Sequence, residues 1–70
     1  MYHLTFDDNV AQETRDSVSE KFESIGWFVL THFVSTSPNT AVTDFYELSW
    51  MQDTTPEIPE LPVGCHLQKQ

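Results

Sequence analysis

Basic residues are scarce in this chain of 70 residues, which has three Lys and Arg against eleven Asp and Glu and a formal charge of −8. This balance argues against direct binding to nucleic acid, because phosphate contacts need a basic face. Binding to an anionic membrane surface is unfavourable for the same reason. A basic protein partner would instead be attracted over a long range, with a fast association that salt slows.

Cysteine and glycine are also nearly absent. The single cysteine, Cys65, excludes an internal disulfide, and beside it stands only His66, without the second ligand pair of a structural zinc site. The two glycines lie far apart, so no glycine-rich phosphate loop is present, and residues 7–9 lack the later Gly and Glu of an EF-hand. The sequence therefore predicts no catalytic residues, no metal and no cofactor, hence a protein that is not an enzyme.

Long hydrophobic runs are missing as well. No stretch approaches the roughly 18 apolar residues of a membrane-spanning helix, and residues 1–7 lack the basic region and apolar run of a signal peptide. With a single thiol, these features predict a cytoplasmic protein. Seventy residues make one small domain near the lower limit for unaided folding, so we expect its nine aromatic residues to build the core and homodimerisation to be a further source of stability.

The first half of the chain predicts one strand and one helix. Residues 2–6 alternate between apolar and polar side chains, as in a strand with one buried face. The helix is predicted over residues 9–25, with residues 7–9 as candidate N-caps. Gly26 stands where a left-handed residue closes a helix, and Trp27 beyond it is placed to make the accompanying hydrophobic contact.

Two further strands are predicted over residues 27–36 and 41–51, joined by a turn at residues 37–40 into an antiparallel hairpin. Residues 27–30 are apolar on both faces, so one face should meet the helix and the other the C-terminal tail or a second subunit. Asp44 interrupts the apolar face of the last strand and predicts a bulge or an exposed edge. Alternation along the strand predicted over residues 41–51 places four residues on the same face: Val42, Tyr46, Leu48 and Trp50.

These elements predict a small two-layer α+β domain of β-α-β-β order over residues 1–51, with one helix on a three-stranded sheet. A right-handed crossover would make the first strand parallel to a neighbour. Residues 52–70 are predicted to form an extended, acidic, Pro-rich tail, because proline recurs every third residue at positions 56, 59 and 62, the period of polyproline II. The tail has three alternatives: packing across the bare sheet face, exchange onto a partner subunit, or mobility, with residues 63–70 frayed.

Acidic side chains recur at spacings of three, four and three residues along the predicted helix. Such spacings place them within an arc of roughly 80° on one helix face. No basic residue interrupts the arc, since Arg15 and Lys21 fall at its borders, where their stems can cover the edge of the core. Asp7 and Asp8 extend the row at its N-terminal end. The predicted partner-binding residues are therefore Glu13, Asp16, Glu20, Glu23, Asp7 and Asp8.

Two functions follow as hypotheses. In the first, the chain is a small acidic inhibitor whose carboxylates mimic a DNA or RNA backbone and occupy the basic surface of a nucleic-acid-handling protein such as a nuclease, a polymerase or a defence complex. Small size, strong acidity and a lack of catalytic motifs are also found in immunity proteins, in antitoxins and in the proteins that phages and mobile elements use against host functions. This comparison is an analogy based on those general properties alone. In the second, the chain is a dimeric structural or adaptor module whose acidity serves only solubility.

Overall fold

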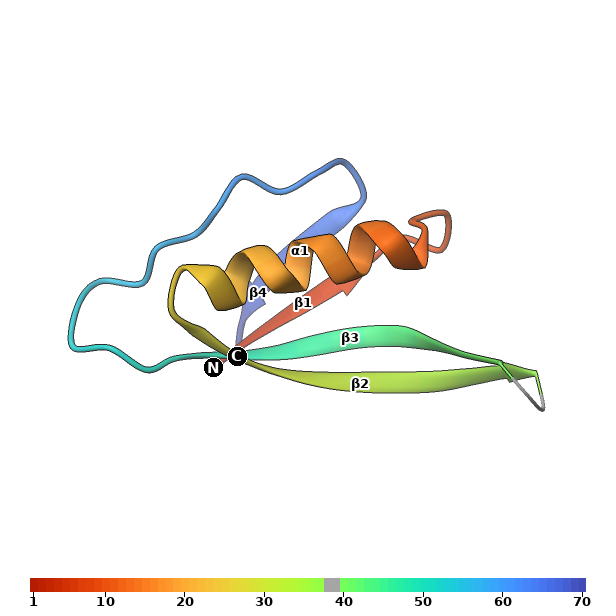
Figure 1. The fold of residues 1–70 in the computed structure, drawn as a ribbon, viewed down its shortest axis with the longest axis horizontal. Coiled ribbons are helices and arrows are strands. Elements are labelled where there is room, and N and C mark those ends of the chain that lie inside the picture. Colours follow the sequence, from red (N-terminus) through yellow and green to blue (C-terminus); the bar gives the residue numbers. More distant parts are fainter. Residues whose placement is uncertain (38–39) are drawn as a thin grey trace.

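The computed structural model describes residues 1–37 and 40–70, and the side chains outside residues 35–41. It contains one helix packed on one face of a four-stranded sheet (Figure 1), which confirms the predicted α+β class. The predicted turn at residues 37–40 includes residues 38 and 39, which lie outside the described residues. The elements in chain order are β1 (Tyr2–Phe6), α1 (Gln12–Ser24), β2 (Trp27–Ser37), β3 (Thr40–Trp50) and β4 (Cys65–Lys69).

The sheet has the strand order β2-β3-β1-β4 and is antiparallel throughout, so the prediction of three strands with β1 parallel to a neighbour is wrong. β1 lies in the centre, where Leu4 is opposite Tyr46 of β3 and Leu67 of β4. The crossover through α1 does make β1 and β2 run in the same direction, but β3 is inserted between them. This is the split β-α-β topology of β-α-β-β-α-β folds, here with residues 51–64 in place of the second helix.

The fourth strand corrects the prediction that the chain frays after residue 63. β4 pairs with β1 along its whole length, from Cys65 opposite Phe6 to Lys69 opposite Tyr2. At one end of this ladder the backbone N–H of Gln70 donates to the Met1 carbonyl at 2.9 Å. The two ends of the chain are therefore held side by side (Figure 1).

The Pro-rich segment between β3 and β4 runs along the helix side of the sheet (Figure 1), so it does not cover the bare sheet face. Two indole N–H groups fix its path: Trp27 donates to the Glu57 carbonyl and Trp50 to the Thr54 carbonyl, both at 2.8 Å. Leu61 packs against the core. A proline at every third position excludes a helix here, because each lacks the N–H that a helix needs.

α1 begins three residues later than predicted, because residues 7–9 form a turn and do not cap the helix. The N-cap is Ala11, which makes no side-chain capping bond. The C-terminal prediction is confirmed: Gly26 has a φ of +114°, and the ring of Trp27 packs edge-on against Phe22 at 5.6 Å. Among the described residues, no helix has both the length and the apolar character needed to cross a bilayer.

Asp44 is the extra residue of a bulge, the first of the two alternatives predicted for it, since His32 is opposite Phe45 whereas Phe33 is opposite Thr43. The bulge reverses the alternation beyond it. Thr43 is therefore fully buried on the helix side, although simple alternation along the strand places it on the face opposite to that of Tyr46. The core between sheet and helix consists of Leu4, Val18, Phe22, Trp27, Tyr46, Leu48 and Cys65.

Candidate functional site

The four carboxylates of α1, here called the acidic row, are Glu13, Asp16, Glu20 and Glu23. All four are exposed. The helix is held in this orientation by Val18 and Phe22, which are buried against the sheet on its opposite side. The alternation of buried and exposed helix positions thus places the row in solvent, where the side chains of a partner can reach it.

Among the side chains that the structure describes, Asp16 is the one member of the row that accepts hydrogen bonds from its neighbours. Its Oδ1 accepts from Gln12 Nε2 at 2.8 Å and from the Tyr46 hydroxyl at 3.4 Å. Both donors are uncharged, so they orient this carboxylate without neutralising it. Gln12 in turn binds Thr43 through its Nε2 and Oε1 atoms, which ties the start of the row to β3.

No member of the row is paired with a basic side chain within the described residues. The side-chain contacts between a carboxylate and a nitrogen base found there are those of His32 with Glu47 at 3.1 Å and of His66 with Asp7 at 3.0 Å, and neither involves α1. Sequence spacing places Arg15 and Lys21 beside the row, and the structure keeps both outside ion-pair distance of it. The row therefore retains its charge for a partner.

Arg15 lies beneath the helix and is only 9% exposed, which the sequence pattern alone did not predict. Its guanidinium donates to three backbone carbonyls, those of Val10 at 3.0 Å, Asp7 at 3.1 Å and Thr43. Its Cζ also lies 5.1 Å from the centre of the Phe6 ring. Arg15 is thus a structural clamp between α1, the turn before it and β3, and its charge is withdrawn from the surface.

The two predicted extensions of the row, Asp7 and Asp8, have different surroundings. Asp7 joins β1 to β4: its carboxylate contacts His66, its N–H donates to the Gly64 carbonyl at 2.8 Å, and its carbonyl accepts from Arg15. Asp8 is exposed and borders a hollow of about 380 Å³ at the start of α1. Asp44 borders the same hollow from β3, so the fold brings a further carboxylate to this end.

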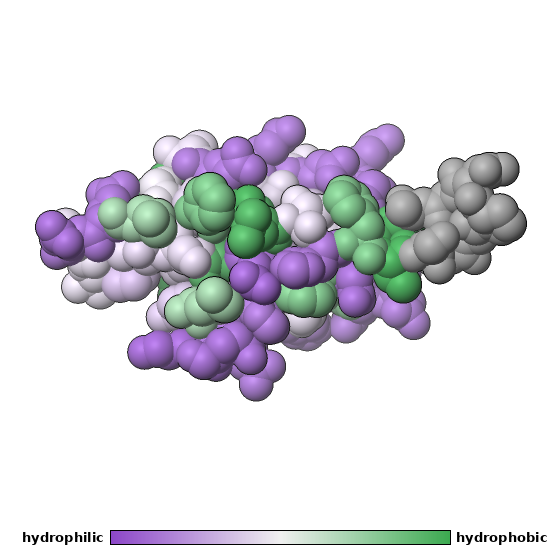
Figure 2. All heavy atoms as spheres, turned by 90° about the horizontal axis from the view of Figure 1, so that it is seen from below, coloured by the Kyte–Doolittle hydropathy of each residue, from purple (hydrophilic) through white to green (hydrophobic). Residues whose placement is uncertain are grey.

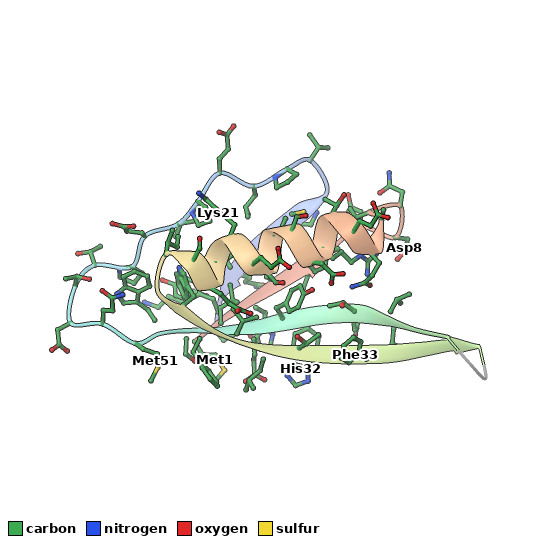
Figure 3. All side chains as sticks on the ribbon, viewed as in Figure 1. Met1, Asp8, Lys21, His32, Phe33 and Met51 are labelled. Atoms are coloured by element: carbon green, nitrogen blue, oxygen red, sulfur yellow. The ribbon has the colours of Figure 1, made fainter. Side chains whose placement is uncertain are left out.

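A groove of about 510 Å³ separates α1 from the Pro-rich segment. Glu13 and Lys21 line it from the helix, and Pro59, Glu60 and Pro62 line it from the opposite wall. Figure 3 shows Lys21 directed toward this segment. Glu60 therefore faces the same groove as Glu13, the first member of the acidic row, because residues 51–64 run beside the helix.

The sheet face opposite α1 carries an aromatic stack that the sequence analysis did not identify. The imidazole of His32 stacks on the Phe45 ring with centres 4.4 Å apart and planes 5° apart, and His3 packs on the same ring at 4.8 Å. Glu47 contacts His32. Strand alternation places each of His3, His32 and Phe45 on this face of its own strand. They lie on three different strands, however, and the sequence analysis did not predict how these strands pair.

Cys65 and His66 are adjacent in β4 and consequently point to opposite faces of the sheet. Cys65 is 8% exposed within the core, whereas His66 is exposed and contacts Asp7. Burial raises the pKa of the Cys65 thiol above its ordinary value, Arg15 partly opposes this rise, and Asp7 adds to it. The thiol is therefore protonated at neutral pH and is not paired with a base.

We expect the Cys65 thiol to react slowly with iodoacetamide. At pH 8 alkylation of the folded chain should be at least about tenfold slower than alkylation in urea, and its rate should rise only above the ordinary thiol range near pH 8.5. Mass spectrometry of timed samples measures both rates. Equal rates for the folded and unfolded chain would contradict the buried position of Cys65.

Among the residues that the structure describes, no three His, Cys, Asp or Glu side chains gather in a way that would hold a metal ion. Comparisons of the chain with protein-family models, with curated proteins and with solved structures gave no match. The function is therefore inferred from the surfaces themselves, of which the acidic row and the uncovered side of the hairpin are the most distinctive.

Proposed function

We propose that this chain is a small acidic binding protein, without enzymatic activity of its own, that occupies a basic nucleic-acid-binding surface of another protein. The observation that carries the proposal is the acidic row: four carboxylates are exposed on one helix face, while Arg15 of the same helix is buried and donates to backbone carbonyls. A helix that needed only solubility would gain from mixing Glu and Lys at spacings of four residues.

The spacing of the row suits phosphate mimicry. Residues 13–23 span about 15 Å of helix axis, which gives one charge per roughly 4 to 5 Å. A single DNA strand carries one charge per about 3.4 Å, so a groove that binds phosphates can meet the row with several of its Lys and Arg side chains. We place such a complex in the cytoplasm and interpret it as inhibition of a nuclease, polymerase or defence complex, in the manner of phage or mobile-element proteins.

The proposal is tested by neutralising the row without changing its shape, through Glu13→Gln, Asp16→Asn, Glu20→Gln and Glu23→Gln. The change at Asp16 keeps an oxygen that accepts from Gln12. At about 0.7 kcal/mol for each exposed pair, four lost contacts should weaken partner binding about 100-fold. Partners are captured with the tagged chain from a lysate of the source cells at low salt, eluted at high salt and identified by mass spectrometry.

A matched control makes this result specific to the row. The variant Asp53→Asn and Glu57→Gln removes two charges from exposed positions away from the row, and the variant Glu20→Gln and Glu23→Gln removes two from the row, so both change the net charge from −8 to −6. We expect the control to keep most of the binding. Equal loss in both variants would mean that only the net charge matters, and retention of binding without the row would refute the proposal.

A second function, a dimeric structural or adaptor module, is favoured by one observation, the exposed apolar side chains of the hairpin. Phe28 is 52% and Leu30 47% exposed on the sheet face that α1 does not cover. Under this alternative, neutralising the acidic row leaves self-association intact. The tagged chain then captures no nucleic-acid-handling protein from the lysate.

A further inference from the structure

β2 lies at one edge of the sheet and offers an unusually long free edge. It has 11 residues, whereas β4 at the opposite edge has 5. One side of β2 pairs with β3, and in the described part of the chain no other backbone hydrogen bond involves β2. A long open edge presents a row of unpaired N–H and C=O groups, which is a template for pairing with another strand.

Most of the usual protections of an edge strand are missing along β2. Its sequence, Trp27 to Ser37, contains no Lys, Arg, Asp, Glu or Pro. The bulge at Asp44 belongs to β3, and the one irregularity of β2 lies near its end, between Ser35 and Ser37, beyond the residues that pair in the arrangement below. Its apolar side chains are open to solvent, among them Phe33 at 64% and Val34 at 44%. Figure 2 shows apolar side chains gathered along the hairpin side of the molecule.

We propose that β2 pairs antiparallel with β2 of a second copy of this chain, which joins the two sheets into one of eight strands. The charge distribution favours a second copy as the occupant. Two chains of net charge −8 repel each other over most of their surfaces, but β2 contains no Asp or Glu, so it is the strip along which identical copies meet without carboxylates of their own opposed to each other. Identical strands also satisfy each other's hydrogen bonds through a two-fold axis.

The alternation of side chains restricts the register, because a two-fold axis perpendicular to the sheet must pair residues of the same face. An axis at Thr31 fulfils this condition, with each Thr31 opposite its counterpart. It also gives every exposed apolar residue of β2 an apolar or aromatic partner. The pairs between the copies are Phe28 with Val34, Val29 with Phe33, and Leu30 with His32.

The same axis keeps both copies of α1 on one side of the joined sheet. The two acidic rows then run antiparallel across one surface, as the two strands of a DNA duplex do. This consequence rests on the proposed function, whereas the dimer itself does not, because it is measured without any partner protein.

The test places charges at the axis. Thr31 is exposed, so Thr31→Glu and Thr31→Lys should leave the monomer folded, as circular dichroism verifies. Each variant alone sets two like charges directly opposite each other and should raise the dimer dissociation constant at least about tenfold. An equimolar mixture of the two variants sets Glu against Lys and should restore the dimer at low salt. The control, Gln68→Glu on the exposed edge of β4, should leave the dimer unchanged.

Sedimentation equilibrium of the full-length chain at about 100 μM gives the mass. The proposal expects twice the chain mass of 8.1 kDa for the wild type and for Gln68→Glu, the single mass for each Thr31 variant, and the doubled mass for their mixture. A monomeric wild type, Thr31 variants that remain dimeric, a mixture that stays monomeric, or loss of the dimer in Gln68→Glu would each overturn it. If a Thr31 variant is unfolded, Thr31→Cys replaces it. Mild oxidation should then link that variant into a disulfide dimer, and failure to do so would also overturn the proposal.

Discussion

Arg15→Ala is expected to lower the free energy of unfolding by about 3 kcal/mol. The guanidinium is buried and satisfies the carbonyls of Asp7, Val10 and Thr43, and each carbonyl left without its donor costs about 1 kcal/mol. A domain of this size has a total stability of only about 4 to 10 kcal/mol. Urea titration followed by the fluorescence of the buried Trp27 measures the change.

Lys21→Ala is the matched control for this prediction, since it removes the same charge from the same helix at an exposed position. Its effect should stay within about 0.5 kcal/mol. If both variants change the stability equally, Arg15 acts only through its charge, and the clamp between α1, the preceding turn and β3 is refuted.

Phe22→Ala is expected to cost about 3 to 5 kcal/mol, the range for removing a fully buried aromatic ring. Phe22 has no exposed surface and contacts Trp27 edge to face, so its loss opens a cavity between α1 and the sheet and also weakens the closure of the helix at Gly26. At about 4 to 8 °C per kcal/mol for a domain of this size, the midpoint of thermal unfolding should therefore fall by at least about 12 °C. Thermal unfolding monitored by circular dichroism tests this.

Phe22→Leu provides the graded comparison, because a hydrophobic change that keeps most of the volume costs less than about 1.5 kcal/mol. A stability of Phe22→Ala close to that of Phe22→Leu would mean that the helix is not held to the sheet through this ring. In that case the orientation of the acidic row would need another explanation.

Local patterns in the sequence were sufficient to predict α1 and the first three strands, and they marked Asp44 as the site of either a bulge or an exposed edge. Each of these elements has a dense signal, such as the alternation of residues 2–6 or the Gly26-Trp27 closure of the helix. β4 has a weak signal, because Cys65 and Leu67 are the only apolar residues among its five. Its stability comes from pairing with β1 at the other end of the chain, which no local pattern contains.

The candidate site could be predicted only in part, because local patterns determine some of its features and contacts between distant residues determine the others. Helical periodicity alone places Glu13, Asp16, Glu20 and Glu23 together, and all four are exposed as expected. The contacts of Asp7 with β4 and the burial of Arg15 depend on Gly64, His66 and Thr43, which come from distant parts of the chain. The aromatic stack around Phe45 likewise requires the strand order, which sequence spacing does not determine.

Competition with nucleic acid tests the central claim most directly. The captured partner is bound to the immobilised chain at low salt, and a duplex of about 20 base pairs is added at increasing concentration. If the acidic row occupies the nucleic-acid-binding surface, the duplex should displace the partner completely, and the affinity of the partner for the chain should fall steeply with salt. A partner that binds the chain and the duplex together, with an affinity insensitive to salt, would contradict the account.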